Sequence, residues 1–154
     1  LGDVYKRQDF IVSEYQLFEA CVAGADAVLL IVAALDQEML LQLLRRVELL
    51  GMAALVEVHD VGELERAVRA EANIVGVNNR NLRTLEVALE TSERLIKALP
   101  NTIVSVAESG LRDQADVLVL RDIGYKGFLI GETLMSSKSP GLKLSEFVLG
   151  ATYR

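Results

Sequence analysis

Acidic side chains stand at the ends of several apolar runs in this sequence. Glu57 lies in LVEVHD, Glu108 and Ser109 lie in VAESG, and Glu132 follows LIG. A carboxylate next to a buried strand is costly unless it is hydrogen-bonded, paired or functional. Burial can also raise the pKa of such a carboxylate toward neutrality, where it can act as a general base.

An amide and a guanidinium occupy the same kind of position in GVNNRNL, as Asn78 and Arg80. The carboxyl ends of parallel strands share one edge of a sheet, so Glu57, Asn78 and Glu108 are expected to converge there. Any one of these residues taken alone is more often a structural loop cap. Their recurrence at successive strand ends favours a functional site.

Two glycines follow the last two apolar runs. Gly110 closes ESG and Gly131 precedes Glu132 in IGET, each ahead of a predicted helix. Backbone N–H groups at such positions can approach an anion closely. The pair predicts a phosphate site, which in barrels is common after strands seven and eight.

His59 and Cys21 are the only residues of their types in the chain. We expect no catalytic role for His59, because no partner for it is evident in the sequence. Leu17, Phe18, Cys21 and Val22 are predicted to share one helical face. Cys21 is therefore expected to be core packing rather than a reactive thiol.

Strand-like runs alternate with amphipathic helical patterns throughout the chain. The strands are expected at 9–12, 26–35, 53–58, 73–78, 102–110 and 126–131, and the helices at 14–24, 36–51, 61–72, 89–100, 112–124, 132–137 and 142–150. Several strands are almost wholly apolar, as in a parallel sheet covered by helices.

The fold class predicted is therefore α/β, in a single domain, either as an open doubly wound sheet or as a β/α barrel. About six βα units are two fewer than a TIM (β/α)8 barrel of roughly 250 residues contains. If the last two strands are the seventh and eighth of a barrel, residues 9–12 would form the third.

Composition narrows the classes of partner. The chain has 154 residues, 51% hydrophobic and 25% charged, with a net charge of -6. A general nucleic-acid binder needs clustered Lys and Arg, so none is predicted. The longest apolar run, 27–35, is too short to cross a bilayer, and no export leader is evident. The cytoplasm is the expected compartment.

The strings DFIVSEYQLFEACVAGADAVLLIVAAL, ALVEVHD, GVNNRNLRTLEV, VAESGL and FLIGETLM occur in order between Asp9 and Met135. In this combination the chain resembles the indole-3-glycerol-phosphate synthase family of tryptophan biosynthesis. The resemblance implies a TIM barrel and a carboxy-lyase. Such an enzyme closes 1-(2-carboxyphenylamino)-1-deoxyribulose 5-phosphate, a small phosphorylated aromatic amine, to indole-3-glycerol phosphate, with loss of CO2 and water and without metal or organic cofactor.

The resemblance also implies roles for individual residues. Glu57 matches the catalytic glutamate and general base. The remaining matches are the substrate-binding residues Asn78, Arg80, Glu108 and Ser109, and the phosphate-binding residues Gly110, Gly131 and Glu132. It leaves open whether the chain is fused to, or associates with, other enzymes of the tryptophan pathway.

Position 8 departs from the family pattern, which has a catalytic Lys before Asp-Phe where this chain has Gln8. A neutral amide cannot serve as that acid. DVYKRQ, residues 3–8, resembles one reading frame of a transposon end used in preparing sequencing libraries. We therefore expect residues 1–8 to be a non-native scar and 9–154 to be a partial barrel domain that is itself inactive.

Two alternatives stay open. One is another phosphate-binding barrel of the same pathway, phosphoribosylanthranilate isomerase or the tryptophan synthase α subunit. The other is a non-catalytic α/β module that holds a phosphorylated metabolite, which the missing Lys would suit.

Overall fold

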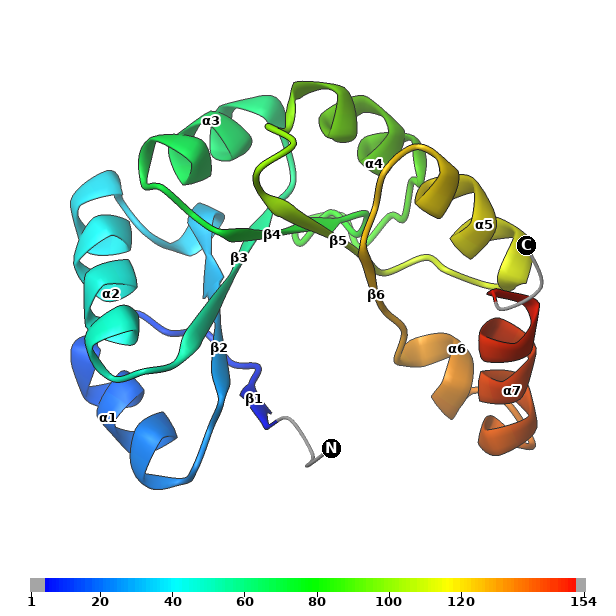
Figure 1. The fold of residues 1–154 in the computed structure, drawn as a ribbon, viewed down its shortest axis with the longest axis horizontal. Coiled ribbons are helices and arrows are strands. Elements are labelled where there is room, and N and C mark those ends of the chain that lie inside the picture. Colours follow the sequence, from blue (N-terminus) through cyan, green and yellow to red (C-terminus); the bar gives the residue numbers. More distant parts are fainter. Residues whose placement is uncertain (1–4, 152–154) are drawn as a thin grey trace.

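The structure, a computed structural model, describes residues 5–151, and its centre is one curled parallel sheet. Six strands lie in chain order, each paired in parallel with the next. They are β1 (Lys6–Arg7), β2 (Ala27–Ile31), β3 (Ala53–Val58), β4 (Ile74–Asn78), β5 (Val104–Glu108) and β6 (Gly127–Leu129). Figure 1 shows the sheet as an arc with β1 and β6 at its two open ends.

The helices lie on the convex side of this arc (Figure 1). They are α1 (Glu14–Val22), α2 (Gln37–Leu49), α3 (Val61–Arg69), α4 (Glu90–Leu95), α5 (Gln114–Asp122), α6 (Glu132–Met135) and α7 (Pro140–Ala151), with short 3-10 helices η1 (Val32–Ala34) and η2 (Ile96–Ala98). Strand and helix alternate through α6, so the chain forms six βα units, as predicted.

Alternate residues of each strand serve different faces of the sheet. Val28, Leu30 and Val56 have no exposed surface and belong to the large cluster between the sheet and the helices. Leu29 and Leu55, their neighbours in sequence, belong to a smaller cluster on the concave face. Both faces are apolar along most of their length, which explains why the strands lack a polar alternation.

Aspartates begin three of the helices. Asp36, Asp60 and Asp113 each accept a hydrogen bond from the backbone N–H three residues on, at 2.8, 2.8 and 3.1 Å. These caps satisfy backbone donors that the first helical turn leaves free. Asp36 is the N-cap of α2, and Gly51 follows α2 at a φ of 72°, which suits a helix stop, so α2 agrees with the helix predicted at 36–51.

The first strand is displaced from its predicted position. Residues 9–12 are not a strand; β1 is Lys6–Arg7, whose partners in β2 are Ala27 and Val28. The Gln16 side chain instead binds the segment between β1 and α1, donating to the Phe10 carbonyl at 2.9 Å and accepting from the Val12 N–H at 2.8 Å. Backbone groups held by the start of α1 cannot also extend the sheet.

The buried face of α1 also differs from the prediction. Leu17 and Ala20 are its buried residues, whereas Cys21 is exposed and Val22 is 90% exposed. The expectation that Cys21 packs in the core is wrong. Small Ala20, rather than Cys21, follows Leu17 on the face that meets the sheet, so the buried stripe is narrower and rotated from the one expected.

Candidate functional site

Glu57 is the penultimate residue of β3 and is 3% exposed. The strand register places it on the same face as Leu55, toward the concave side of the arc. Asn78, the last residue of β4, donates from Nδ2 to Glu57 Oε1 at 3.1 Å, and its Oδ1 accepts from the Arg80 N–H at 2.9 Å. The amide therefore links the carboxylate to the loop that leaves the sheet edge.

Glu108 ends β5 and is also 3% exposed. The strand between it and Glu57 carries Gly76, which pairs with Glu57. A Cβ on Gly76 would lie 1.9 Å from Glu108 Oε1, so the carboxyl group occupies the space where position 76 has no side chain. The absence of a side chain at Gly76 lets a β5 carboxyl reach across β4 toward β3.

Near neutral pH one of the two carboxyl groups is ionised and the other is protonated. Burial, with the negative charge of Glu57, raises the pKa of Glu108 to about 8. Burial also favours the neutral form of Glu57, but contacts from His59 and Asn78 outweigh it and lower the pKa of Glu57. An ionised Glu57 beside a protonated Glu108 forms a base and an acid in one site.

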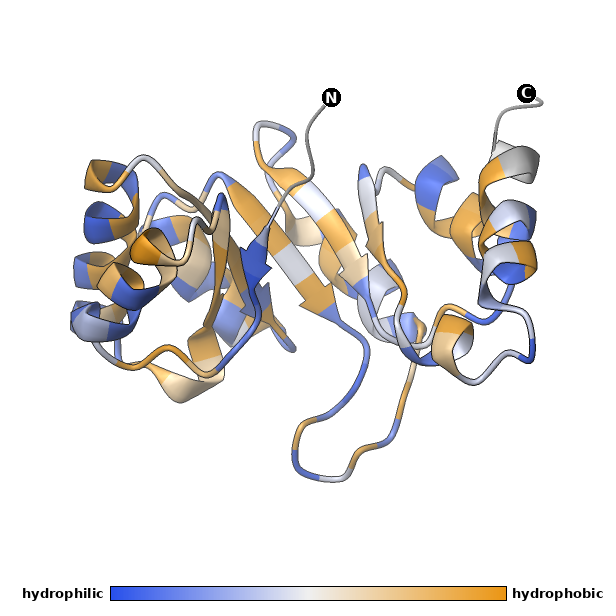
Figure 2. Ribbon diagram, turned by 90° about the horizontal axis from the view of Figure 1, so that it is seen from below, coloured by the Kyte–Doolittle hydropathy of each residue, from blue (hydrophilic) through white to orange (hydrophobic). Residues whose placement is uncertain are grey.

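The loop after β4 is fastened to the end of β5. Asn79 donates from Nδ2 to the carbonyls of Glu108 and Ser109, both at 3.1 Å, and its Oδ1 accepts from the Ser92 hydroxyl at 2.8 Å. Sequence reasoning passed over Asn79, whose neighbours Asn78 and Arg80 matched the family pattern. Beyond it the polar loop projects from the edge at which the strands end (Figure 2).

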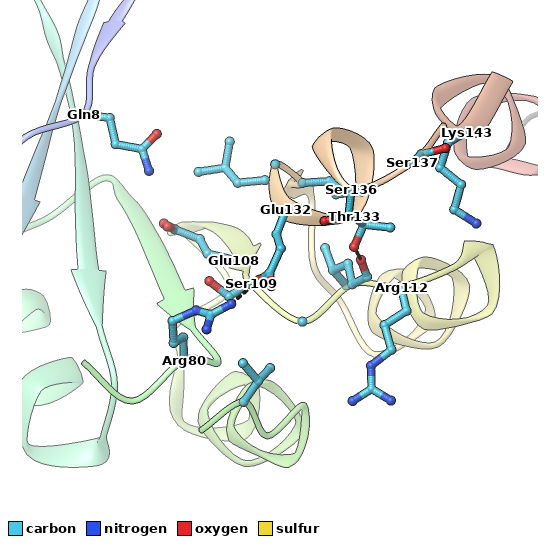
Figure 3. A pocket seen from close by; sticks show the side chains of 16 residues that line it. Gln8, Arg80, Glu108, Ser109, Arg112, Glu132, Thr133, Ser136, Ser137 and Lys143 are labelled. Carbon is cyan, nitrogen blue, oxygen red and sulfur yellow. Dashed lines mark hydrogen bonds and ion pairs between the residues drawn. The ribbon is translucent and has the colours of Figure 1, made fainter. Parts of the chain in front are cut away.

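A cavity of about 920 Å³ opens at this edge beside β5 and β6. Seven residues singled out from the sequence line it: Gln8, Arg80, Glu108, Ser109, Gly110, Gly131 and Glu132. Figure 3 shows Gln8 and Glu108 on the strand side, Arg112 and Lys143 on the opposite side, and Arg80 paired with Glu132. Glu57 and Asn78 are not among the lining residues; Glu57 interacts with the lining residue Glu108, and Asn78 bonds Glu57 and the backbone of the lining residue Arg80.

The two predicted phosphate-binding glycines differ in their surroundings. Gly131 is the N-cap of α6, and nothing lies within 4 Å of where its Cβ would be. Gly110 has a φ of 80° and a Cβ there would lie 2.4 Å from Val87, so only glycine suits this turn. α5 begins four residues after Gly110 and is already capped by Asp113.

Two further ionisable groups, Lys6 and His59, lie near the carboxylates, and sequence reasoning missed Lys6. Lys6 lies two residues before Gln8, and burial lowers its pKa against the raising effect of Glu108 and Glu57. Strand alternation gives residues 6 and 8 the same face, which is the signal that could have found Lys6. His59, for which no partner was evident in the sequence, lies between Glu57 and Glu63.

Among residues 5–151, no group of three or more His, Cys, Asp and Glu side chains is arranged to hold a metal ion. In the same span no helix is long and apolar enough to cross a membrane.

The sequence matches known proteins along nearly its whole length. A family model described as "Indole-3-glycerol phosphate synthase" matches residues 3–147. A protein of that name from Parafrankia sp. is 50% identical over 147 residues, which cover 96% of this chain and 55% of that protein. "Indole-3-glycerol phosphate synthase 1" of Streptomyces coelicolor is 50% identical over 142 residues, 92% of this chain and 53% of that protein. The chain thus spans about half the length of the curated relatives it matches.

Solved structures resemble the fold at low sequence identity. The 3-hexulose-6-phosphate synthase of Salmonella typhimurium superposes with a TM-score of 0.77 at 14% identity, over 94% of this chain and 71% of that one. FabK of Thermotoga maritima gives 0.70 at 13% identity, over 90% and 44%. The predicted fold class, a partial barrel of the TIM family, is confirmed.

Proposed function

Because the chain belongs to the indole-3-glycerol phosphate synthase family, we propose that a protein with its site and the full length of its relatives closes 1-(2-carboxyphenylamino)-1-deoxyribulose 5-phosphate to indole-3-glycerol phosphate. The reaction releases CO2 and water, which makes the enzyme a carboxy-lyase of tryptophan biosynthesis. A substrate that carries a phosphate does not cross membranes freely, so the proposed compartment is the cytoplasm.

The observation that carries the proposal is the paired state of Glu57 and Glu108 at one sheet edge. Glu57, held ionised by His59 and Asn78, is the proposed general base for the proton lost on rearomatisation and dehydration. Glu108, neutral at pH 7, can donate a hydrogen bond to the substrate from the cavity wall. Ser109, next to it, is proposed to bind the substrate with Asn78 and Arg80.

The part of the cavity away from Glu108 suits the phosphate group of a ligand. Gly110 and Gly131 line it with the α6 residue Glu132, and Arg112 and Lys143 add positive charge on the side away from the strands. We assign the phosphate to the Gly110 and Gly131 loops, where backbone N–H groups can bind oxygens without crowding. The aromatic amine would then lie toward Glu108.

Position 8 bears directly on activity. Gln8 lines the cavity where the family pattern has Lys, and an amide cannot supply a proton at a useful rate. Residues 1–8 as a non-native scar remain a proposal; of these, 1–4 lie outside the described residues, while Lys6 and Arg7 form β1. The same observation favours a second candidate, a non-catalytic module that binds the phosphorylated metabolite.

An assay of indole-3-glycerol phosphate formation separates the two candidates. It compares the 154-residue chain, its Gln8→Lys variant, and a chimera in which the front of the Parafrankia relative is joined ahead of Asp9. Only the chimera is expected to form indole-3-glycerol phosphate. Glu57→Gln in the chimera should lower kcat on the order of 10²-fold or more, the scale of a lost general base.

Glu65→Gln, an exposed carboxylate on α3, is the matched control and should leave kcat unchanged. A folded chimera that binds the substrate without turnover would support the binding module and overturn the synthase proposal. Robust turnover by the 154-residue chain would overturn the role assigned to position 8.

A further inference from the structure

Three ionisable side chains, Glu57, His59 and Glu63, form a continuous row from the end of β3 to the first turn of α3. His59 Nδ1 lies 3.1 Å from Glu63 Oε2, and His59 Nε2 lies 3.3 Å from Glu57 Oε1. All three are largely buried, with side-chain exposures of 16% for His59, 4% for Glu57 and 17% for Glu63. Neither His59 nor Glu63 is itself among the proposed catalytic and substrate-binding residues.

The start of α3 fixes the imidazole in this row. Asp60 caps the helix by accepting from the Glu63 N–H at 2.8 Å, which places Glu63 in the first turn. Glu63 reaches back and accepts from the His59 backbone N–H at 2.7 Å as well as facing its ring. One carboxylate thus holds both the backbone and the ring of His59, so the direction of Nε2 toward Glu57 is set by helix capping.

The far end of the row meets the proposed base on one oxygen. His59 Nε2 and Asn78 Nδ2 both approach Glu57 Oε1, at 3.3 and 3.1 Å. The histidine contact is at ion-pair distance, and both hydrogen bonding by His59 and the charge of its imidazolium lower the pKa of Glu57. The Asn78 bond fixes the carboxylate's rotation, and the imidazole supplies the charge.

We propose that His59, anchored by Glu63, is a positioning residue for Glu57: as an imidazolium it keeps the proposed general base ionised and oriented. The inference rests on the proposed function of Glu57 and adds to it the group that sets its charge. Burial alone would lower the pKa of His59, but the Glu57 and Glu63 carboxylates outweigh it and raise that pKa to about 9. The imidazole is then protonated at neutral pH.

Other charges act on the same carboxylate and must be accounted for. Glu108, from β5, is protonated near neutral pH and adds little negative charge there. Lys6, from β1, attracts both Glu57 and Glu108. Because neither contacts the His59 ring, a change that follows the His59–Glu63 pair can be distinguished from one caused by these groups.

The test is a proton and carboxyl NMR titration of the 154-residue chain, in which His59 is the sole histidine and gives a unique ring signal. We expect its midpoint near pH 9 and a fall toward the ordinary value of about 6.5 in both Glu57→Gln and Glu63→Gln. Glu65→Gln, on the exposed side of the same helix, is the control and should leave it unchanged.

The reverse coupling is measured on Glu57. Its carboxyl signal, assigned by its loss in Glu57→Gln, should titrate below the ordinary range in the unmodified chain and at a higher pH in His59→Asn, because the lowering effect of His59 is then absent. In the chimera the same substitution should move the acid limb of kcat/KM upward and lower kcat while leaving KM unchanged. His59→Gln, a second neutral amide, should behave alike.

A His59 midpoint near 6.5, or one that Glu57→Gln leaves in place, would overturn the inference. An unmoved Glu57 midpoint in His59→Asn would do the same. Because the NMR readouts need no turnover, an inactive chimera would count against the proposed function and leave the coupling between His59 and Glu57 to be decided by titration.

Discussion

The convex and concave faces of the sheet are built from the same strands but have different composition. The convex face meets the helices in one large apolar cluster whose strand residues, such as Leu30, Val56 and Val77, have no exposed surface. The concave face has a small apolar cluster around Leu29 and Leu55, followed toward the strand ends by buried carboxyl and amide groups. Residues one position apart in sequence therefore contribute to stability on one face and to chemistry on the other.

The largest effect on stability is expected on the convex face. Leu30→Ala removes a side chain with no exposed surface, and should lower the free energy of unfolding by about 2–5 kcal/mol. The matched change on the concave face is Leu129→Ala, in β6, which is only partly buried and should cost less. Urea unfolding of both variants makes the measurement; equal losses would contradict the division between the faces.

Gly76→Ala tests the concave face at its most crowded point. The new Cβ would lie 1.9 Å from Glu108 Oε1, so Glu108 must move, at an expected cost of about 1–3 kcal/mol in urea unfolding. Gly62→Ala, whose Cβ would meet its nearest atom at 3.4 Å, is the control and should be nearly neutral. Adding Glu108→Ala to Gly76→Ala should recover part of the loss, because the double change removes the clash.

The charge states on the concave face predict a stability that falls as pH rises from 5 to 8. Glu108, with its pKa raised to about 8, and His59, with its pKa raised to about 9, both bind more protons when folded than when unfolded across this range. Stability that is present at low pH is therefore lost, on the order of 1 kcal/mol or more. The lowered pKa of Glu57 acts only below its ordinary value of 4.5, outside this window.

Urea midpoints at pH 5, 6.5 and 8 measure this dependence. Glu108→Gln, which stays neutral, should flatten it, whereas a change at an exposed carboxylate such as Glu65→Gln should not. A midpoint that rises with pH would show that Glu108 is ionised in the folded protein.

The smallest effect is expected on the outward side of the helical layer. Cys21→Ser changes an exposed side chain and should alter the free energy of unfolding by no more than about 0.5 kcal/mol. Ala20→Ser, one residue earlier and 1% exposed, should cost more. The Cys21 thiol should also react with a chromogenic disulfide in the folded protein; a thiol that reacts only in urea would contradict its exposure.

The sequence predicted the order of elements well because capping and apolar runs are local signals. The helix predicted at 36–51 begins at the cap residue Asp36 and ends at Gly51, and locating it needed no knowledge of distant residues. The first strand was misplaced because Gln16, on a later element, takes the backbone groups of residues 10 and 12. The burial of α1 was misjudged because the composition of its apolar face does not reveal which side meets the sheet.

The site was predictable in its location and less so in its chemistry. Glu57, Asn78 and Glu108 stand at successive strand ends, and parallel register alone brings them together. Which carboxyl is neutral depends on burial and on His59, whose partners are a strand residue and a helix residue. Glu57, His59 and Glu63 lie within seven residues of each other, but the burial of the carboxyl groups and the contacts of Glu57 with Asn78 and Glu108 join separate strands, so the charges could be assigned only from the folded chain.

Because Gly76 lacks a side chain where the Glu108 carboxyl lies, the substitutions that positions 76 and 108 can accept depend on each other. Glu108 needs position 76 to stay a glycine, yet nothing near Gly76 in sequence imposes this. In a lineage in which residue 108 shortens, substitutions at 76 become tolerable, and one of them would then block the return of a long carboxyl at 108. The order in which the two positions change thus decides whether the loss of that carboxyl can be reversed.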